Sequence, residues 1–203
     1  MIQKIKKEIP SSDGIHTLRG FVLVPENPKG ILQIAHGMTE HIGRYEAFMR
    51  YLAENGFIAC GHDHLGHGTT AENGHEHGYF ASNNGHKLLC EDVVLFGNAV
   101  REDYPDLPLI LLGHSMGSFI VRGAVRRHPD ACDALIVMGT SGKNPLALPG
   151  LLISKIICKI KGEKFISPFV LSVAFSSSFH CISLPVQMGI FLLLRRKPIS
   201  GRT

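Results

Sequence analysis

Five residues, Gly113-His114-Ser115-Met116-Gly117, place a serine between two glycines where two different sequence patterns meet. The apolar run over 107–112 is typical of a buried strand, and the segment 118–125 is typical of a helix. A G-x-S-x-G sequence at such a junction is typical of a nucleophile elbow, a sharp turn that exposes the serine hydroxyl above a sheet. We expect the glycines to permit the turn and Ser115 to act as a nucleophile.

A serine hydroxyl becomes a good nucleophile when a histidine takes its proton and a carboxylate orients that histidine. After Ser115 the sequence holds few acids and histidines: Asp130, Asp133, Glu163, His128 and His180. The two aspartates flank the next strand, the first histidine ends a helix, and no carboxylate follows the second. The triad acid and base are therefore not evident in this chain. His114 is expected to pack away from the nucleophile.

A second motif follows the apolar run over 31–35 and covers residues 36–45, His-Gly-Met-Thr-Glu-His-Ile-Gly-Arg-Tyr. Acyl transfer needs main-chain N–H groups that bind the oxyanion. The usual donors are the residue after the nucleophile and one residue on an early strand-to-helix loop. Met116 and Met38 occupy these two places, with His36 and Gly37 supporting the loop. Together with Met49, the two methionines are also expected to line the core or an acyl pocket.

Three motifs, H-G-x-x-E-H-x-G-R-Y, then G-H-D-H-x-G-H-G at 61–68, then G-H-S-M-G, resemble those of monoacylglycerol lipases and bacterial lysophospholipases. These enzymes form part of the serine-aminopeptidase-like group of the α/β-hydrolase superfamily, and the resemblance covers about 14–176. It implies that Ser115 is the nucleophile and that the main-chain amides of Met38 and Met116 form an oxyanion hole. It also implies no metal or cofactor. The superfamily's later acid and histidine are unmatched, so the domain is expected to be truncated.

The segment 61–86 is crowded with histidines around Asp63: His62, His64, His67, His75, His77 and His86. Imidazole is a common metal ligand, which raises the hypothesis of a metal site. The H-x-H pairs lie on loops, however, and match neither the helical H-E-x-x-H pattern nor a C-x-x-C pair. We therefore expect a turn-forming or solvated histidine cluster without a metal.

Turn residues separate the apolar runs along the chain. Strands are expected over 16–24, 31–35, 57–60, 107–112 and 134–138, and helices over 45–54, 87–103 and 118–128. This alternation predicts an α/β fold with a mostly parallel sheet, helices on both faces, and the C-terminal strands missing. Ligands of such sheets bind beyond the carboxyl ends of the strands, where Ser115 and the loop after 35 both lie.

The 203 residues, 44% of them hydrophobic, suit one packed domain. The net charge of +4 arises in the tail, because five of the 21 basic residues follow the last acid, Glu163. The remaining 16 bases face 17 acids, so a nucleic-acid-binding surface is not expected. The five cysteines form no C-x-x-C pair and the N-terminus lacks the apolar core of a signal peptide. These features favour free thiols and a cytoplasmic location.

We divide the chain into a hydrolase core over 1–145 and a partial lid with a divergent apolar tail over 146–203. The segment 165–194 contains no charged residue. Its prolines and serines make a membrane-spanning helix the weaker alternative to an apolar lid over about 146–176. Such a lid is expected to admit acyl chains and to touch a membrane surface transiently. A frameshift or premature end is a hypothesis that explains the tail, and an unpaired sheet edge would favour self-association.

The sequence therefore predicts a serine hydrolase that cleaves carboxylic esters of lipid-like substrates through an acyl-serine intermediate. The alternative is an inactive remnant, because removing the histidine of such a triad lowers turnover by about 10⁶. An epoxide hydrolase or aminopeptidase on the same scaffold also stays open, since one fold hosts many chemistries. The motifs leave the acyl-chain length, the headgroup and the oligomeric state undetermined.

Overall fold

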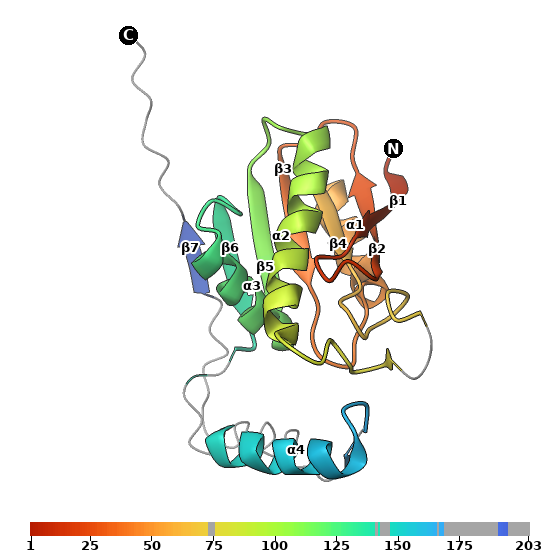
Figure 1. Ribbon diagram of the computed structural model, residues 1–203. Helices are drawn as coiled ribbons and strands as arrows, with labels where there is room; N and C mark the ends of the chain where they lie inside the picture. The colour runs from red at the N-terminus through yellow and green to blue at the C-terminus, as the bar shows by residue number, and fades with distance from the viewer. Residues whose placement is uncertain (73–75, 141, 143–146, 166, 169–190, 195–203) are drawn as a thin grey trace.

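The computed structural model describes residues 1–72, 76–140, 142, 147–165, 167–168 and 191–194. These residues form one seven-stranded sheet with strand order β1-β2-β4-β3-β5-β6-β7 (Figure 1). In chain order the elements are β1 (Gln3–Pro10), β2 (Thr17–Val24), β3 (Gly30–Ala35), the 3-10 helix η1 (Ile42–Tyr45), α1 (Glu46–Glu54), β4 (Phe57–His62), α2 (Gly85–Asp103), β5 (Leu109–His114), α3 (Met116–Arg127), β6 (Ala134–Met138), α4 (Ala147–Lys161) and β7 (Phe191–Leu194).

The central strands β4, β3, β5 and β6 run parallel, as the alternation of strands and helices predicted. All six residues of β3 are buried, because helices cover both faces of a parallel sheet and leave no solvated side. The remaining pairings are antiparallel: β1 with β2, β2 with β4, and β6 with β7. The predicted α/β class is therefore confirmed.

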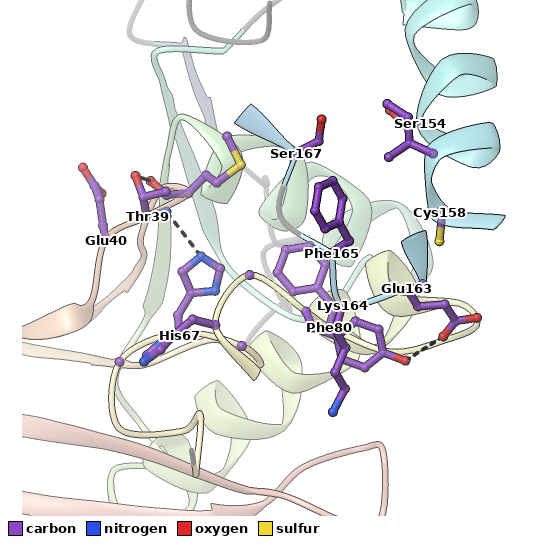
Figure 2. A pocket seen from close by; sticks show the side chains of 18 of the residues that line it. Thr39, Glu40, His67, Phe80, Ser154, Cys158, Glu163, Lys164, Phe165 and Ser167 are labelled. Carbon is purple, nitrogen blue, oxygen red and sulfur yellow. Dashed lines mark hydrogen bonds between the residues drawn. The ribbon is translucent and has the colours of Figure 1, made fainter. Parts of the chain in front are cut away.

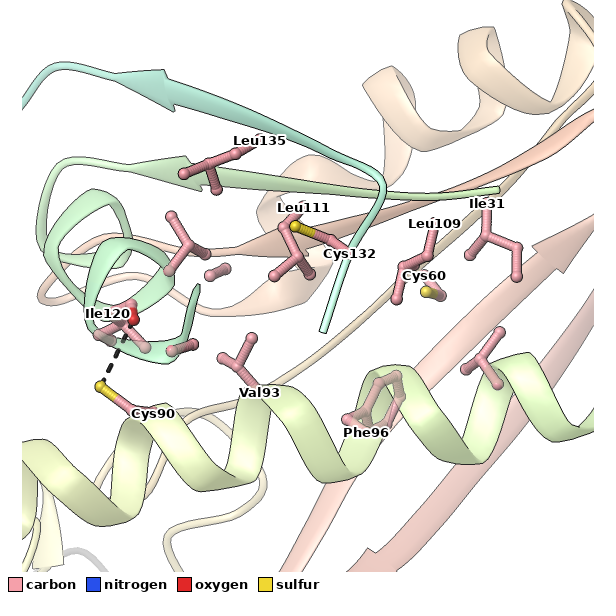
Figure 3. Packing of buried hydrophobic residues seen from close by; sticks show 14 of the residues in the cluster. Ile31, Cys60, Cys90, Val93, Phe96, Leu109, Leu111, Ile120, Cys132 and Leu135 are labelled. Carbon is pink, nitrogen blue, oxygen red and sulfur yellow. Dashed lines mark hydrogen bonds between the residues drawn. The ribbon is translucent and has the colours of Figure 1, made fainter. Parts of the chain in front are cut away.

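Helices α2 and α3 cover one face of the sheet. From α2, Val93 and Phe96 project towards the strands and pack near Leu109 and Leu111 of β5, while α3 adds Ile120 (Figure 3). Helix α1 covers the opposite face through Met49 and Ala53, which are buried in a second apolar cluster. Two apolar layers therefore hold the sheet between them, which confirms the prediction of helices on both faces.

Two strands lie outside the expected set. The edge strand β1 is mostly exposed and rich in lysine, a composition that protects edges from further pairing but gives little apolar periodicity. Strand β7 lies in the uncharged tail and pairs with β6 from Ala134 to Val137. The outer edge of β6, expected to be unpaired, is therefore occupied along these residues.

Helix α4 lies beyond the end of the sheet where the parallel strands finish (Figure 1). It falls in the region expected to begin a lid. Its exposed apolar side chains are Leu148, Leu151, Leu152, Ile153, Ile156 and Ile160. None of the described helices combines the length and apolar composition needed to cross a bilayer. The rest of the expected lid and tail, including His180, lies largely outside the described residues.

A buried carboxylate fixes helix α2 to the turn between β1 and β2. Asp92 is fully buried and accepts hydrogen bonds from the Ser12 N–H at 2.7 Å and from the Ser11 hydroxyl at 3.0 Å. These bonds satisfy a charged group that would otherwise be costly to remove from water.

We expect Asp92→Ala to lower the free energy of unfolding by roughly 1–3 kcal/mol, because it leaves two donors unsatisfied. Asp103→Ala is the matched control on the same helix. It removes an exposed ion pair with Lys7, which should cost less than about 1 kcal/mol. Urea denaturation measures both values, and equal losses would contradict the role assigned to Asp92.

Candidate active site

Ser115 lies at the sharp turn between β5 and α3. Its backbone has φ 52° and ψ −118°, a conformation that a residue with a side chain rarely adopts. The Ser115 N–H donates to the Met138 carbonyl at 3.0 Å, which ties the turn to the end of β6. The strained residue is therefore the serine itself, which is held where the carboxyl ends of β5 and β6 meet.

The glycines of this motif serve close packing rather than the strained turn, which corrects the sequence-based expectation. Neither has a positive φ. A Cβ at Gly117 would lie 2.0 Å from the Ala35 carbonyl oxygen, and one at Gly113 would lie 2.4 Å from the Gly117 oxygen. Both glycines let α3 begin directly against the ends of β3 and β5.

The loop after β3 lies beside the serine. A Cβ at Gly37 would be 3.3 Å from the Ser115 Cβ, so the main chain of the loop touches the candidate nucleophile. Met38 is the next residue along this loop. Met116 is the first residue of α3, where main-chain N–H groups have no acceptor within the helix. The two methionines predicted to donate to an oxyanion thus come from segments that flank Ser115.

Glu40 fixes the start of this loop. Its Oε2 accepts hydrogen bonds from the Gly37 N–H at 2.9 Å and from the Tyr45 hydroxyl at 2.6 Å. Its Oε1 accepts from the Arg44 guanidinium at 2.7 Å. Burial disfavours ionisation, but the hydrogen bonds from Tyr45 and Gly37 outweigh it and hold the pKa of Glu40 below its usual value. An ionised carboxylate is therefore built into the loop.

His114 joins the same network. Its Nδ1 lies 2.9 Å from the Tyr45 hydroxyl and 3.5 Å from Glu40 Oε2. Because the Tyr45 hydroxyl donates to Glu40, we assign the proton of the His114 contact to Nδ1, which donates to the Tyr45 oxygen. His114 is thus engaged with the loop rather than with Ser115, in agreement with its expected orientation.

The motif at 61–68 forms a turn around Asp63. The carboxylate accepts hydrogen bonds from the Ile42 N–H and the Thr69 N–H, both at 2.7 Å, and from the Thr69 hydroxyl at 2.9 Å. Gly68, at φ 49°, packs directly on the carboxylate. Asp63 therefore joins β4, the following turn and the start of η1.

The histidines of the expected turn-forming or solvated cluster differ in exposure. His62, His64 and His67 are buried, so solvation was wrong for these three, whereas His77 and His86 are exposed. His36, His62 and His64 have no exposed surface and His67 has 4%. The His36 ring lies 4.1 Å from that of His64 and 5.2 Å from that of His67. Among the described residues, which omit His75, no group of three or more His, Cys, Asp or Glu side chains is arranged to hold a metal.

The acids and histidines after Ser115 lie elsewhere in the described structure. Asp133 pairs with Arg101 at 2.8 Å and accepts the Leu109 N–H at the opposite end of β5. His128 pairs with Glu91 at the far end of α3, about 20 Å along the helix axis from Ser115. Glu163 accepts from the Tyr79 hydroxyl at 3.0 Å. Within the described ranges, no histidine or carboxylate hydrogen-bonds to the Ser115 hydroxyl.

A pocket of about 640 Å³ lies between residues 38–41, residues 66–68 and 77–80, and helix α4 (Figure 2). Its apolar lining includes Met38, Phe80, Ile157 and Phe165. Ser115 does not line it, but Met38, which follows the glycine in contact with Ser115, does. The pocket therefore opens beside the candidate nucleophile rather than on top of it.

Sequence reasoning missed Glu40, Tyr45, Asp63 and His67 as parts of the site. Each of these residues belongs to one of the three motifs, so the sequence already pointed to the segments that contain them. Their roles depend on hydrogen bonds between segments far apart in the sequence, which spacing alone does not reveal.

A family model described as serine aminopeptidase, S33, matches residues 26–174. The chain belongs to this family. The human monoglyceride lipase is 38% identical over 93 residues, which cover 46% of this chain and 29% of that protein. The monoglyceride lipase homolog of monkeypox virus is 34% identical over 121 residues, which cover 55% of this chain and 38% of that protein. These matches confirm the α/β-hydrolase resemblance drawn from the motifs.

Among solved structures, a thermostable carboxyl esterase from Bacillus coagulans in complex with glycerol has a TM-score of 0.74 and 32% sequence identity. The matched region covers 83% of this chain and 55% of the esterase chain. The chain thus spans less than two fifths of the length of the two lipases and about half that of the esterase.

The buried histidines make folding sensitive to acid. Burial lowers the pKa of His36 to about 4 and that of His62 to about 3, whereas both titrate near 6.5 when exposed. The unfolded chain therefore binds more protons below about pH 6.5. We expect the free energy of unfolding to be nearly constant above this pH and to fall below it by up to about 1.4 kcal/mol per pH unit for each such histidine.

His62→Leu should reduce this acid dependence, because it removes one of the buried imidazoles. Neither ring nitrogen of His62 has a hydrogen-bond partner among the described residues, so the substitution leaves no partner unsatisfied. His86→Leu, at an exposed position on α2, is the control and should leave the dependence unchanged. Chemical denaturation between pH 4.5 and 7.5, a range of about three pH units that includes the pKa of an exposed histidine, measures how steeply the free energy of unfolding depends on pH. If His62→Leu leaves the pH dependence of the free energy of unfolding unchanged, His62 does not contribute to it and the prediction is wrong.

Proposed function

We propose that the chain is a serine hydrolase in which the strained turn at Ser115 acts as a nucleophile elbow and cleaves carboxylic esters. The main support for this proposal is the contact between the Gly37 main chain and the Ser115 Cβ. This contact places the loop that contains Met38, the second proposed main-chain N–H donor after Met116, beside the nucleophile. Family membership and the esterase likeness support it.

In the proposed reaction, the Ser115 Oγ attacks the ester carbonyl carbon and its proton passes to a general base. The carbonyl oxygen becomes an oxyanion, which accepts hydrogen bonds from the Met38 and Met116 N–H groups. Collapse expels the alcohol, which takes up the proton, and leaves an acyl-serine that water then hydrolyses. Within this scheme His36 and Gly37 hold the loop that carries Met38.

The proposed substrates are esters with a lipid-like acyl chain. The pocket between Met38, Phe80 and Phe165 is mostly apolar, and burial of each methylene of an acyl chain contributes about 0.8 kcal/mol. The curated relatives named as monoglyceride lipases point to the same class. The glycerol bound to the esterase neighbour is compatible with an alcohol of that type.

A non-catalytic remnant is the second candidate. It is favoured by one observation, that no histidine among the described residues is hydrogen-bonded to the Ser115 hydroxyl. A serine without its histidine retains little reactivity, since the members of such a triad act as a unit.

Ser115→Ala distinguishes the two functions. We expect the unchanged chain to hydrolyse p-nitrophenyl butyrate and to be labelled by a fluorophosphonate probe, and Ser115→Ala to lose both, with turnover falling by as much as about 10⁶-fold. Ser154→Ala, which removes a hydroxyl that lines the pocket on α4, is the control and should retain labelling. Absence of labelling in the unchanged chain would support the remnant.

We further propose that α4 contacts a membrane surface transiently. Ser154, Ile157 and Cys158 face the pocket. Leu148, Leu152, Ile156 and Ile160, spaced four residues apart, form an exposed apolar stripe. Lys155, Lys159 and Lys161 add positive charge beside it. An amphipathic surface of this kind suits the boundary between lipid headgroups and acyl chains.

The double substitution Leu152→Glu and Ile156→Glu should weaken binding to phosphatidylcholine–phosphatidylserine vesicles by about tenfold or more, because it places two charges in the apolar stripe. Leu95→Glu, at an exposed apolar position on α2, is the matched control and should bind like the unchanged chain. Vesicle co-sedimentation measures both. Equal binding by all three proteins would exclude α4 as the contact.

A further inference from the structure

We propose that His67 is a positioning residue that holds the oxyanion loop by accepting a hydrogen bond from the Thr39 N–H. This inference rests on the proposed function. His67 comes from the turn after β4 and reaches across to the loop after β3, where its Nε2 lies 3.3 Å from the Thr39 nitrogen (Figure 2).

The Met38 N–H lies between two anchored amides. The preceding amide, that of Gly37, donates to Glu40 Oε2 at 2.9 Å, and the following amide, that of Thr39, donates to His67. Each peptide unit is planar, so holding the units on both sides leaves the Gly37–Met38 unit little freedom to rotate. Glu40 and His67 together therefore determine the direction of the proposed oxyanion donor.

Thr39 needs such an anchor. Its φ of 60° lies in the left-handed region, which costs a residue with a Cβ about 1 kcal/mol or more unless the surroundings stabilise it. The Thr39 side chain is exposed and donates only to the neighbouring Met38 carbonyl. Among the described residues, the contact with His67 is what joins the Thr39 main chain to a buried part of the protein.

The His67 ring is itself held in the required tautomer. Its Nδ1 lies 3.0 Å from the Leu65 carbonyl oxygen, which can only accept, so the proton resides on Nδ1 and Nε2 is an acceptor. The ring stacks on Phe80 with centroids 5.7 Å apart and planes 18° apart. A protonated His67 would direct an N–H against the Thr39 N–H and break the anchor.

The groups around His67 act in both directions: the Leu65 carbonyl and Asp63 favour its protonation, whereas His77 opposes it. The rings of His36 and His64 also face His67, with centroids 5.2 Å and 6.4 Å away. Burial is the largest influence and lowers the pKa of His67 below 6.5. The neutral acceptor form is therefore present at neutral pH, and the anchor is lost on the acid side.

Two variants separate positioning from simple packing. His67→Gln keeps an amide oxygen at about the reach of Nε2, whereas His67→Leu keeps the bulk and has no acceptor. Both lose the stacking on Phe80. We expect His67→Leu to slow fluorophosphonate labelling of Ser115 by about 10²-fold, the effect of losing one oxyanion donor, and His67→Gln to stay within about threefold of the unchanged chain. Equal slowing in both variants would overturn the proposal.

An NMR titration of the full chain tests the anchor without relying on reactivity. In the unchanged chain the Thr39 amide resonance should shift below pH 6.5 together with the His67 imidazole, and in His67→Gln this shift should be absent. A Thr39 amide that does not follow His67 would overturn the proposal. If the unchanged chain is not labelled at all, the proposed hydrolase activity fails and the amide titration alone decides the anchor.

Discussion

The parallel pairing of β3 with β5, with Ala35 opposite Gly113, is the constraint on which the site depends. This register ends both strands at the same level and places the loop after β3 against the turn at Ser115. The contact tolerates no extra atom at Gly117, because a Cβ there would lie 2.0 Å from the Ala35 oxygen. Sheet register and glycine packing together convert two distant motifs into one site.

Buried polar groups then fix the loop in place. Glu40, Asp63 and His67 each accept hydrogen bonds from main-chain N–H groups of segments 36–45 and 61–69. Burying these acceptors is costly unless their partners are present, so the loop cannot shift without leaving them unsatisfied. The same arrangement requires neutral histidines beneath the loop. The fixed position of the loop and the expected acid sensitivity of the fold therefore depend on the same buried groups.

Helix α4 carries apolar side chains on both of its sides. One side closes the pocket with Ile157 and Cys158, and the other exposes Leu148, Leu152 and Ile156. The Tyr79 hydroxyl donates a hydrogen bond to Glu163, just after the end of α4. This distribution of apolar side chains is what the proposed contact with a lipid surface requires.

Local patterns determined the order and type of most elements. Apolar runs such as 31–35 and 134–138, and helical spacing over 87–103, identified strands and helices within a few residues, and three motifs identified the family. Strand β1 escaped because its lysine-rich edge carries little periodicity. Only the tertiary structure showed that Ser115, rather than a glycine, takes the strained φ, that the histidines around Asp63 are buried, and that Glu40 and His67 anchor the amides on either side of Met38. Periodicity reports which face of a segment is apolar, whereas these features depend on hydrogen bonds and close contacts between segments that the sequence separates.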